Sequence, residues 1–128
     1  GYYYGCCHTG AWGYKDERKR LYKVYYALKA FGEIVKGYPT LGEVKTTGSL
    51  TTLIAKSTDG RRTALLAVDY CGLPGDVVLE TKGLPKGCPS VRVLDHTRDL
   101  EPVDVRVVGN RLVLPKRDRD SVSYLVTW

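Results

Sequence analysis

The spacing of apolar residues near the start of the chain is that of an amphipathic helix. Between Glu17 and Lys36 they recur every three or four residues, which places them along one side of a helix. These apolar positions are Leu21, Val24, Tyr25, Leu28, Phe31, Ile34 and Val35. Asp16 is suited to cap the first turn, and Gly37 to the C′ position, with Pro39 preventing continuation. The pattern predicts one helix over residues 17–36.

Short strand-like segments, separated by turn residues, follow this helix. Apolar and charged residues alternate around Arg92 and Asp104, as in an antiparallel sheet with one face in water. Asp59-Gly60 and Gly109-Asn110 predict hairpin turns. The expected strands are Gly42–Thr46, Leu50–Ser57, Thr63–Tyr70, Val77–Lys82, Ser90–Asp95, Val103–Val108, Arg111–Leu114 and Ser121–Trp128. The predicted fold class is mainly β: a two-sheet antiparallel β-sandwich of about eight strands preceded by one amphipathic α-helix.

The chain is expected to consist of an N-terminal strand, loop and helix over residues 1–37 and a β-sandwich over residues 38–128. A lone helix ahead of a sandwich has little to pack on within its own domain. We therefore expect its apolar face to dock on the open face of the sandwich, on a neighbouring domain or on a second copy of the chain. The expected docking face consists of Leu21, Val24, Tyr25, Leu28, Phe31 and Val35.

Composition places the chain among single globular domains. It has 128 residues, of which 43% are hydrophobic and 27% charged, enough for one core. No apolar run approaches the roughly 20 residues that cross a bilayer, so no membrane partner is expected. The first residues also lack the basic and apolar regions of a secretory signal, and the sequence indicates no cellular compartment.

The net charge of +6 is modest and concentrated near the helix. Residues 1–37 carry seven Lys or Arg and three Asp or Glu, a balance of +4, which leaves +2 for residues 38–128. A nucleic-acid module would place a basic run within a wider basic surface or a known motif, and neither is present. We interpret the basic run Lys15–Arg20 as a solvated first helical turn and expect no nucleic-acid partner.

The four cysteines do not form a metal-binding pattern. Cys6 and Cys7 are adjacent and precede His8, but the second closely spaced pair of a structural zinc site is missing. Cys71 and Cys88 fall on different predicted loops. No metal and no cofactor is expected, and the cysteines are either free thiols or include one disulfide.

The order of these segments resembles the C-terminal part of glycoside hydrolases with a (β/α)8 barrel, most closely the family 39 β-xylosidases. Such enzymes end their barrel with an aromatic strand, a Trp-containing loop and a last helix, and continue into a small β-sandwich. The segments that carry the resemblance are Tyr2–Tyr4, Trp12-Gly13, Tyr25–Glu33, Ala64–Tyr70, Gly83–Gly87, Val91–Asp95, Leu112–Leu114 and Ser121–Leu125. The resemblance implies that residues 1–37 are the end of a barrel whose earlier strands precede this chain.

The catalytic residues of such an enzyme are not expected in this chain. Glycosidases of this type resemble one another in using two Glu residues, one directly after an Asn. The single Asn here, Asn110, is followed by Arg111. Asp95-His96 with Asp99 could form a base and its orienting group, but Asp in such a position more commonly forms a turn. The chain alone is therefore expected not to be an enzyme.

Three functions remain open at this point. The first is a non-catalytic accessory domain that supports a catalytic barrel, with that barrel or a second copy as the partner of the helix face. The second is a carbohydrate-binding module, for which exposed aromatic rings would be needed; the candidate residues are Tyr3, Tyr4 and Trp12. The third is a protein-interaction domain that docks through the helix.

Overall fold

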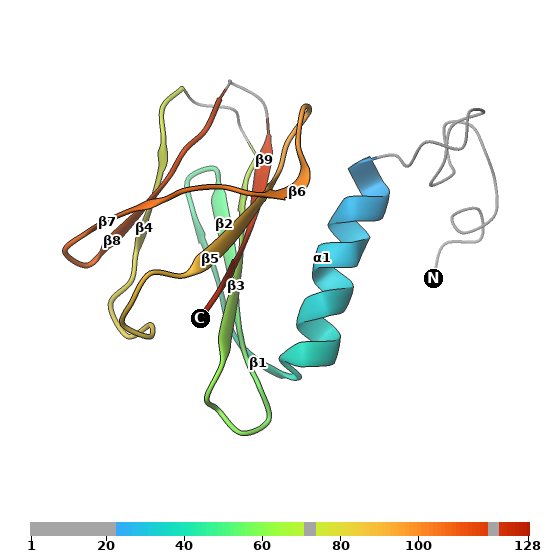
Figure 1. Ribbon diagram of the computed structural model, residues 1–128, viewed down its shortest axis with the longest axis vertical. Coiled ribbons are helices and arrows are strands. Elements are labelled where there is room, and N and C mark those ends of the chain that lie inside the picture. The colour runs from blue at the N-terminus through green and yellow to red at the C-terminus, as the bar shows by residue number, and fades with distance from the viewer. Residues whose placement is uncertain (1–22, 71–73, 118–120) are drawn as a thin grey trace.

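The computed structural model describes residues 23–70, 74–117 and 121–128, and within them it contains one helix and nine strands in two antiparallel sheets (Figure 1). The helix α1 spans Lys23–Gly37. The strands are β1 (Thr40–Thr47), β2 (Leu50–Lys56), β3 (Thr63–Asp69), β4 (Val77–Glu80), β5 (Ser90–Leu94), β6 (Asp99–Pro102), β7 (Arg106–Val108), β8 (Arg111–Leu114) and β9 (Val122–Thr127). This confirms the predicted mainly β fold with a preceding helix.

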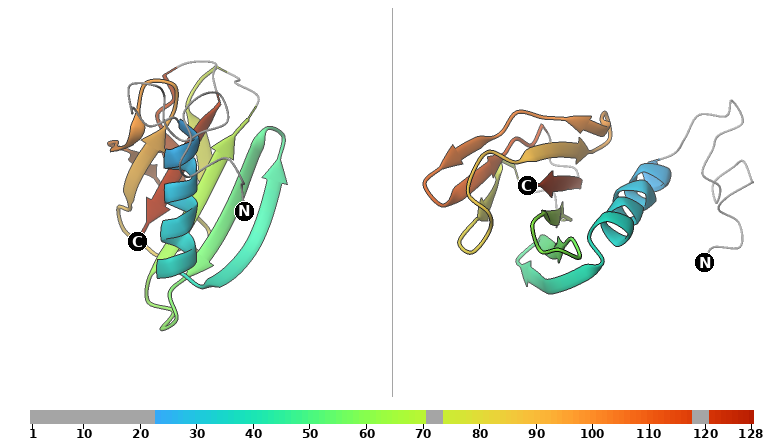
Figure 2. Two further views of the ribbon diagram at one scale, coloured as in Figure 1. Left: turned by 90° about the vertical axis from the view of Figure 1, so that its right-hand side faces the viewer. Right: turned by 60° about the horizontal axis from the view of Figure 1, so that its bottom comes forward.

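The six-stranded sheet is the central layer of the molecule. Its order is β1-β2-β3-β9-β5-β6, and the second sheet has the order β4-β8-β7. Figure 2 shows α1 on one side of the six-stranded sheet and the smaller sheet on the other. Alternate residues of β9 therefore enter two different cores: Tyr124 and Val126 pack between the sheets, whereas Leu125 packs beneath the helix. We call the side of the six-stranded sheet that faces the smaller sheet its inner face, and the side that faces α1 its outer face.

The predicted hairpin turns are present. Gly60 has φ +70° and Gly109 has φ +59°, backbone conformations that a side chain makes costly. The Asp59 carboxylate accepts hydrogen bonds from the Ser57 hydroxyl at 2.6 Å and from the Arg61 backbone N–H at 3.1 Å, which closes the β2–β3 turn. Gly109 and Asn110 form the two-residue connection between Val108 of β7 and its partner Arg111 of β8.

The expected single strand Val103–Val108 is wrong. Residues Asp99–Pro102 pair with β5 in the large sheet, and Arg106–Val108 pair with β8 in the small sheet, so the chain changes sheets between them. Val103 and Val105 still pack against the inner core while the chain crosses. The apolar alternation continues because both sheets face the same core, and alternation reports which side of a segment is buried, not which sheet it joins.

The end of the helix also differs from the prediction. Gly37 is not among the glycines with positive φ, so it is not a left-handed C′ residue. The helix includes Gly37, and the Tyr38 N–H donates to the Ile34 carbonyl at 2.8 Å. Pro39 then prevents continuation because it disfavours the helical conformation of the residue before it. The predicted start of the helix, with Asp16 as its cap, lies outside the described residues. Within the described part of the chain, no helix is long and apolar enough to span a membrane.

Candidate functional site

α1 is held on the outer face of the six-stranded sheet by a small apolar contact. Ala30 and Ile34 are buried, and Tyr26 is half-buried beside them. Their partners on the sheet are Ala55, Ala64, Leu94, Leu100 and Leu125. Leu100 reaches this cluster with a positive φ of 61°, a strained conformation for a residue with a side chain. The helix therefore packs on the sandwich through Ala30 and Ile34.

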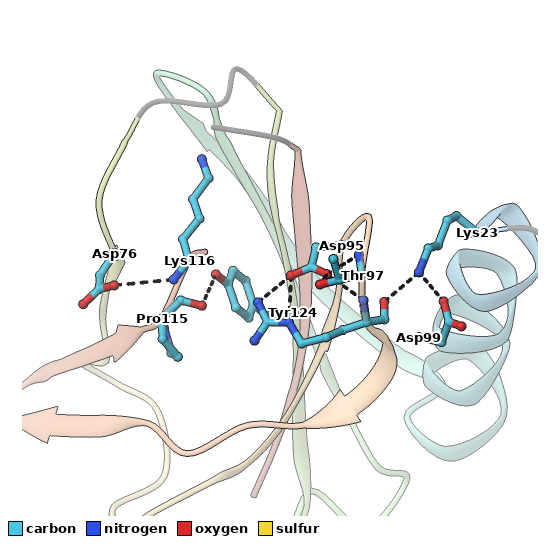
Figure 3. Close-up of polar contacts among 9 residues, drawn as sticks. Lys23, Asp76, Asp95, Thr97, Asp99, Pro115, Lys116 and Tyr124 are labelled. Atoms are coloured by element: carbon cyan, nitrogen blue, oxygen red, sulfur yellow. Dashed lines mark hydrogen bonds and ion pairs between the residues drawn. The ribbon is translucent and has the colours of Figure 1, made fainter. Parts of the chain in front are cut away.

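Two ion pairs fix the helix at separate points along its length. Near its start, the Lys23 ammonium pairs with the Asp99 carboxylate and donates to the Arg98 carbonyl at 3.2 Å (Figure 3). Farther along, the Arg92 guanidinium of β5 pairs with Glu33, and its Nη1 lies 3.3 Å from Glu33 Oε1. The hydrogen bond from Arg92 lowers the pKa of the Glu33 carboxyl below its ordinary value.

Four apolar side chains of the helix are exposed and are not part of the core cluster beneath it. Val24, Leu28, Phe31 and Val35 follow one another at intervals of four, three and four residues, and each is between 37% and 48% exposed. At 100° per residue, this stripe lies about 110° around the helix from Ala30 and Ile34. We call these four residues the helix stripe.

The residues of the predicted docking face therefore have different environments in the structure. Four of its members form the exposed stripe, and Tyr25 is half-buried with its ring in edge-to-face contact with Tyr26, the two ring centres lying 5.3 Å apart. Leu21 lies outside the described residues. The contact with the sheet is made instead by Ile34, which the pattern grouped with the stripe, and by Ala30, which the pattern did not include because alanine is only weakly apolar.

The strand β1 adds exposed apolar residues on the same side of the sheet. Leu41 pairs with Ala55, which lies beneath the helix, and Val44 pairs with Leu53. Since Leu53 and Ala55 are two residues apart on β2, Leu41 and Val44 project from the outer face. They are 57% and 61% exposed. Figure 2 shows that α1 covers part of this face and leaves β1 uncovered by the other described elements, whereas Ala55 of β2 is buried beneath the helix.

The helix stripe, Leu41 and Val44 together form what we call the outer apolar surface. Large contiguous apolar patches on protein surfaces occur at protein and membrane contacts and in ligand grooves. Glu33 faces β5 on one flank of the helix, and Lys29 and Lys36 are exposed on the helix beside it.

The Asp95–Asp99 segment is a structural turn. The Asp95 carboxylate accepts hydrogen bonds from the Thr97 N–H at 2.9 Å, the Arg98 N–H at 2.7 Å and the Arg98 Nε at 2.7 Å (Figure 3). Burial opposes ionisation of Asp95, but the bonds from Arg98 and Thr97 outweigh it and hold the pKa of this carboxyl well below its usual range. Asp99 pairs with Lys23. Both carboxylates are thus engaged by residues other than His96, which accords with the interpretation of this segment as a turn.

Three of the described carboxylates have lowered pKa values. Hydrogen bonds to the charged form hold the pKa of Glu33, Asp59 and Asp95 below their ordinary values, from Arg92 in the first case, from Ser57 and the Arg61 N–H in the second, and from Arg98 and Thr97 in the third. Among the described residues, no group of three or more His, Cys, Asp or Glu side chains could hold a metal ion. Cys88 is a free, exposed thiol, and Cys6, Cys7 and Cys71 lie outside the described residues.

The aromatic residues proposed for sugar contact, Tyr3, Tyr4 and Trp12, also lie outside the described residues. Within the described part, Tyr124 is buried, and its hydroxyl donates to the Pro115 carbonyl at 3.1 Å (Figure 3). Burial raises the pKa of this phenol. Trp128 is half-buried at one end of the sandwich. The surroundings of Trp128 could not be predicted from the sequence, because they are assembled from loops far apart in the chain.

Two solved structures share this fold over nearly the whole chain. The family 30 subfamily 8 glycoside hydrolase Xyn30A, a xylanase from Clostridium acetobutylicum, matches 91% of this chain with a TM-score of 0.62 and 12% identity. A family 30 endoxylanase from Clostridium papyrosolvens matches 93% with a TM-score of 0.66 and 14% identity. No protein-family model and no curated protein sequence matches the chain.

The matched regions make up 30% and 31% of those two xylanase chains, so this chain spans less than a third of their length. At 12% and 14% identity, the likeness establishes a shared fold. Both enzymes belong to family 30, so the resemblance to family 39 is not confirmed. The chain thus has the fold of a part of these glycoside hydrolases that covers about three tenths of their length.

Proposed function

We propose that this chain is a non-catalytic accessory domain of a glycoside hydrolase, in which the helix stripe packs against a catalytic (β/α)8 barrel. The single observation that carries the proposal is the outer apolar surface: a helix fixed to the sandwich by one side presents a second apolar side to solvent. The fold shared with part of two xylanases supports a glycosidase as the parent protein. A parent similar to family 39 β-xylosidases is the finer form of the proposal and rests on the resemblance of the sequence segments.

The size of the outer apolar surface suits a contact within one polypeptide. Complete burial of an aliphatic or aromatic side chain contributes about 1.5–3 kcal/mol, so burying the exposed parts of the six residues of the outer apolar surface contributes roughly 4–9 kcal/mol from this chain. A bimolecular association costs about 4–15 kcal/mol in translational and rotational entropy, which is of similar size. A covalently attached barrel avoids most of that entropy, which makes it a better partner than a second copy of the chain.

The test compares amide hydrogen exchange in the isolated 128-residue chain and in the polypeptide encoded by its complete reading frame. We expect peptides that cover Val24–Val35 and Leu41–Val44 to exchange more slowly in the complete polypeptide, because the barrel buries them. Peptides from the β7–β8 hairpin are the internal control and should not change. Equal exchange in both samples would refute docking of the barrel on this surface. Protection in the isolated chain, together with a dimer in sedimentation, would assign the surface to self-association instead.

A further inference from the structure

A hollow of about 320 Å³ opens at one end of the sandwich, away from the helix. Its walls come from three places: the loop between β4 and β5, the β7–β8 hairpin and Trp128 at the end of the chain. Figure 1 shows the β4–β5 loop near the C-terminus. This volume is at the lower end of the range for small-molecule sites and accommodates one or two sugar rings.

The walls combine an apolar floor with polar groups. Leu84, Pro85, Leu112 and the Trp128 ring supply apolar area, and Asn110 supplies an amide that both donates and accepts hydrogen bonds. Pyranose rings have the matching character, since their C–H faces pack on aromatic and apolar side chains while their hydroxyls need polar partners. A simple inorganic anion would gain no binding free energy from contact with the apolar residues of the floor.

Trp128 brings an unsatisfied donor to this end of the sandwich. Its indole Nε1 is buried and has no hydrogen-bond partner among the described residues. The residue is held in place by paired backbone bonds, with the Trp128 N–H donating to the Thr63 carbonyl at 2.9 Å and the Thr63 N–H donating to the Trp128 carbonyl at 3.3 Å. Buried indole N–H groups usually have an acceptor, and leaving one without costs about 1–3 kcal/mol. Because Nε1 itself is buried, a ligand in the hollow would contact the indole ring and not this nitrogen.

The charge around the hollow is positive. Lys82 and Lys86 line it, and a neighbouring hollow that shares Lys82 and Asn110 adds Arg111 and Glu80. Three cationic side chains and one carboxylate therefore surround the two hollows. Since Lys and Arg donate charge-assisted hydrogen bonds to carboxylates, this balance favours an anionic ligand over a neutral one.

The loop that carries the two lysines has a defined backbone. Gly83 and Gly87 adopt φ values of +86° and +120°, and the Leu84 N–H donates to the Thr81 carbonyl at 3.0 Å. Pro85 lies between the two glycines and restricts the chain further. A loop ordered before binding loses less entropy when a ligand arrives, which favours affinity.

We propose that this hollow binds an acidic saccharide, with a uronic acid ring on the Trp128 side and its carboxylate at Lys82 and Lys86. Asn110 contacts ring hydroxyls. The hollow adjoins the inner core, whereas α1 lies on the outer face of the six-stranded sheet, so a partner on the helix stripe leaves the hollow open. This site is independent of the accessory role and would exist in the isolated chain.

The test follows the Trp128 indole in the full 128-residue chain. Trp12→Phe leaves Trp128 as the single Trp, so its fluorescence and its indole N–H resonance report on this site alone. The probes are trigalacturonate and xylotriose, which are both chains of three pyranose rings but differ in carboxylates. We expect trigalacturonate to shift the indole signal with at least about tenfold higher affinity than xylotriose, and to bind more weakly as salt is raised above about 0.1 M.

Two lysine variants distinguish binding of trigalacturonate in this hollow from nonspecific attraction of an anion to a basic protein. Lys82→Ala and Lys86→Ala remove exposed side chains and should each weaken trigalacturonate binding several-fold. Lys29→Ala removes an exposed lysine from the helix on the other side of the sheet and is the matched control, with no expected change. The proposal is overturned if neither saccharide moves the indole signal, if both bind equally, or if all three lysine variants weaken binding alike.

Discussion

The Glu33 carboxylate of α1 lies against the Arg92 guanidinium of β5, which joins two residues 59 positions apart and fixes the helix to the sheet. This pair is half-exposed on both sides, with side-chain exposures of 37% and 30%. It therefore orients the helix more than it stabilises it. Together with the buried Ala30 and Ile34, it determines which side of the helix faces the sheet and which side remains for a partner.

The Glu33–Arg92 pair makes a small part of the stability dependent on pH. The folded pKa of Glu33 is lowered from its ordinary value of 4.5, so its contribution is complete above about pH 4.5 and is lost as the pH falls through the lowered pKa. Glu33→Gln should cost about 0.5–1 kcal/mol at pH 7 after allowance for solvent screening. Urea unfolding at pH 7 and at about pH 3 measures this, and a cost that is larger at the lower pH would contradict it.

Ile34 and Val35 are neighbours in sequence with opposite environments. Ile34→Ala removes a fully buried side chain between helix and sheet and should lower the free energy of unfolding by about 2–4 kcal/mol. Val35→Ala removes a side chain that is 48% exposed in the isolated chain and should cost less than about 0.5 kcal/mol. Denaturant unfolding of both variants compares them directly. Similar costs would mean that the helix packs through another side.

Asp95 is the acceptor on which the β5–β6 turn depends. Asp95→Asn leaves the Arg98 guanidinium, of which only 8% is exposed, without a charged partner, and should cost about 3–5 kcal/mol. Asp99→Asn is the matched control, because Asp99 pairs with Lys23 at a site that is 40% exposed and should cost less than about 1 kcal/mol. Thermal unfolding of the two variants tests this prediction. Equal losses of melting temperature would show that burial of the ion pair does not determine its contribution to stability.

Two glycines should respond to alanine with opposite signs. Gly32 lies inside α1 with open space where a Cβ would be placed, so Gly32→Ala should stabilise the fold by about 0.5–1 kcal/mol through helix propensity. Gly109 also has open space but has φ +59°, so Gly109→Ala should destabilise by about 1–2 kcal/mol. Unfolding midpoints measure both changes. Stabilisation by both substitutions would contradict the left-handed turn at Gly109.

Local patterns predicted the elements of the fold well, because each depends on residues close in sequence. The helix around Leu28, the hairpin at Gly109 and the strands that alternate near Arg92 all followed from spacing and turn residues. The split of Val103–Val108 between two sheets could not be predicted in this way. The inward side chains of both sheets enter one core, so the alternation is the same whether a segment stays in one sheet or crosses to the other.

The candidate sites, too, could be predicted from local sequence patterns only in part. The helix stripe could be listed from its spacing, but separating Val35 from Ile34 required the position of the sheet, since both are strongly apolar and adjacent. The hollow beside Trp128 could not be found from sequence at all. Lys82, Asn110 and Trp128 are brought together only by the pairing of β4 with β8 and by the position of β9 beneath them.

Calorimetric unfolding of the complete polypeptide tests the accessory role most directly. We predict that Phe31→Asp, which places a charge in the middle of the helix stripe, lowers the melting temperature of the catalytic barrel by several degrees. Val108→Asp, at a residue of β7 that is 63% exposed, is the matched control and should leave the barrel transition unchanged. A barrel transition that is the same in wild type, Phe31→Asp and Val108→Asp would contradict the claim that this helix supports a barrel.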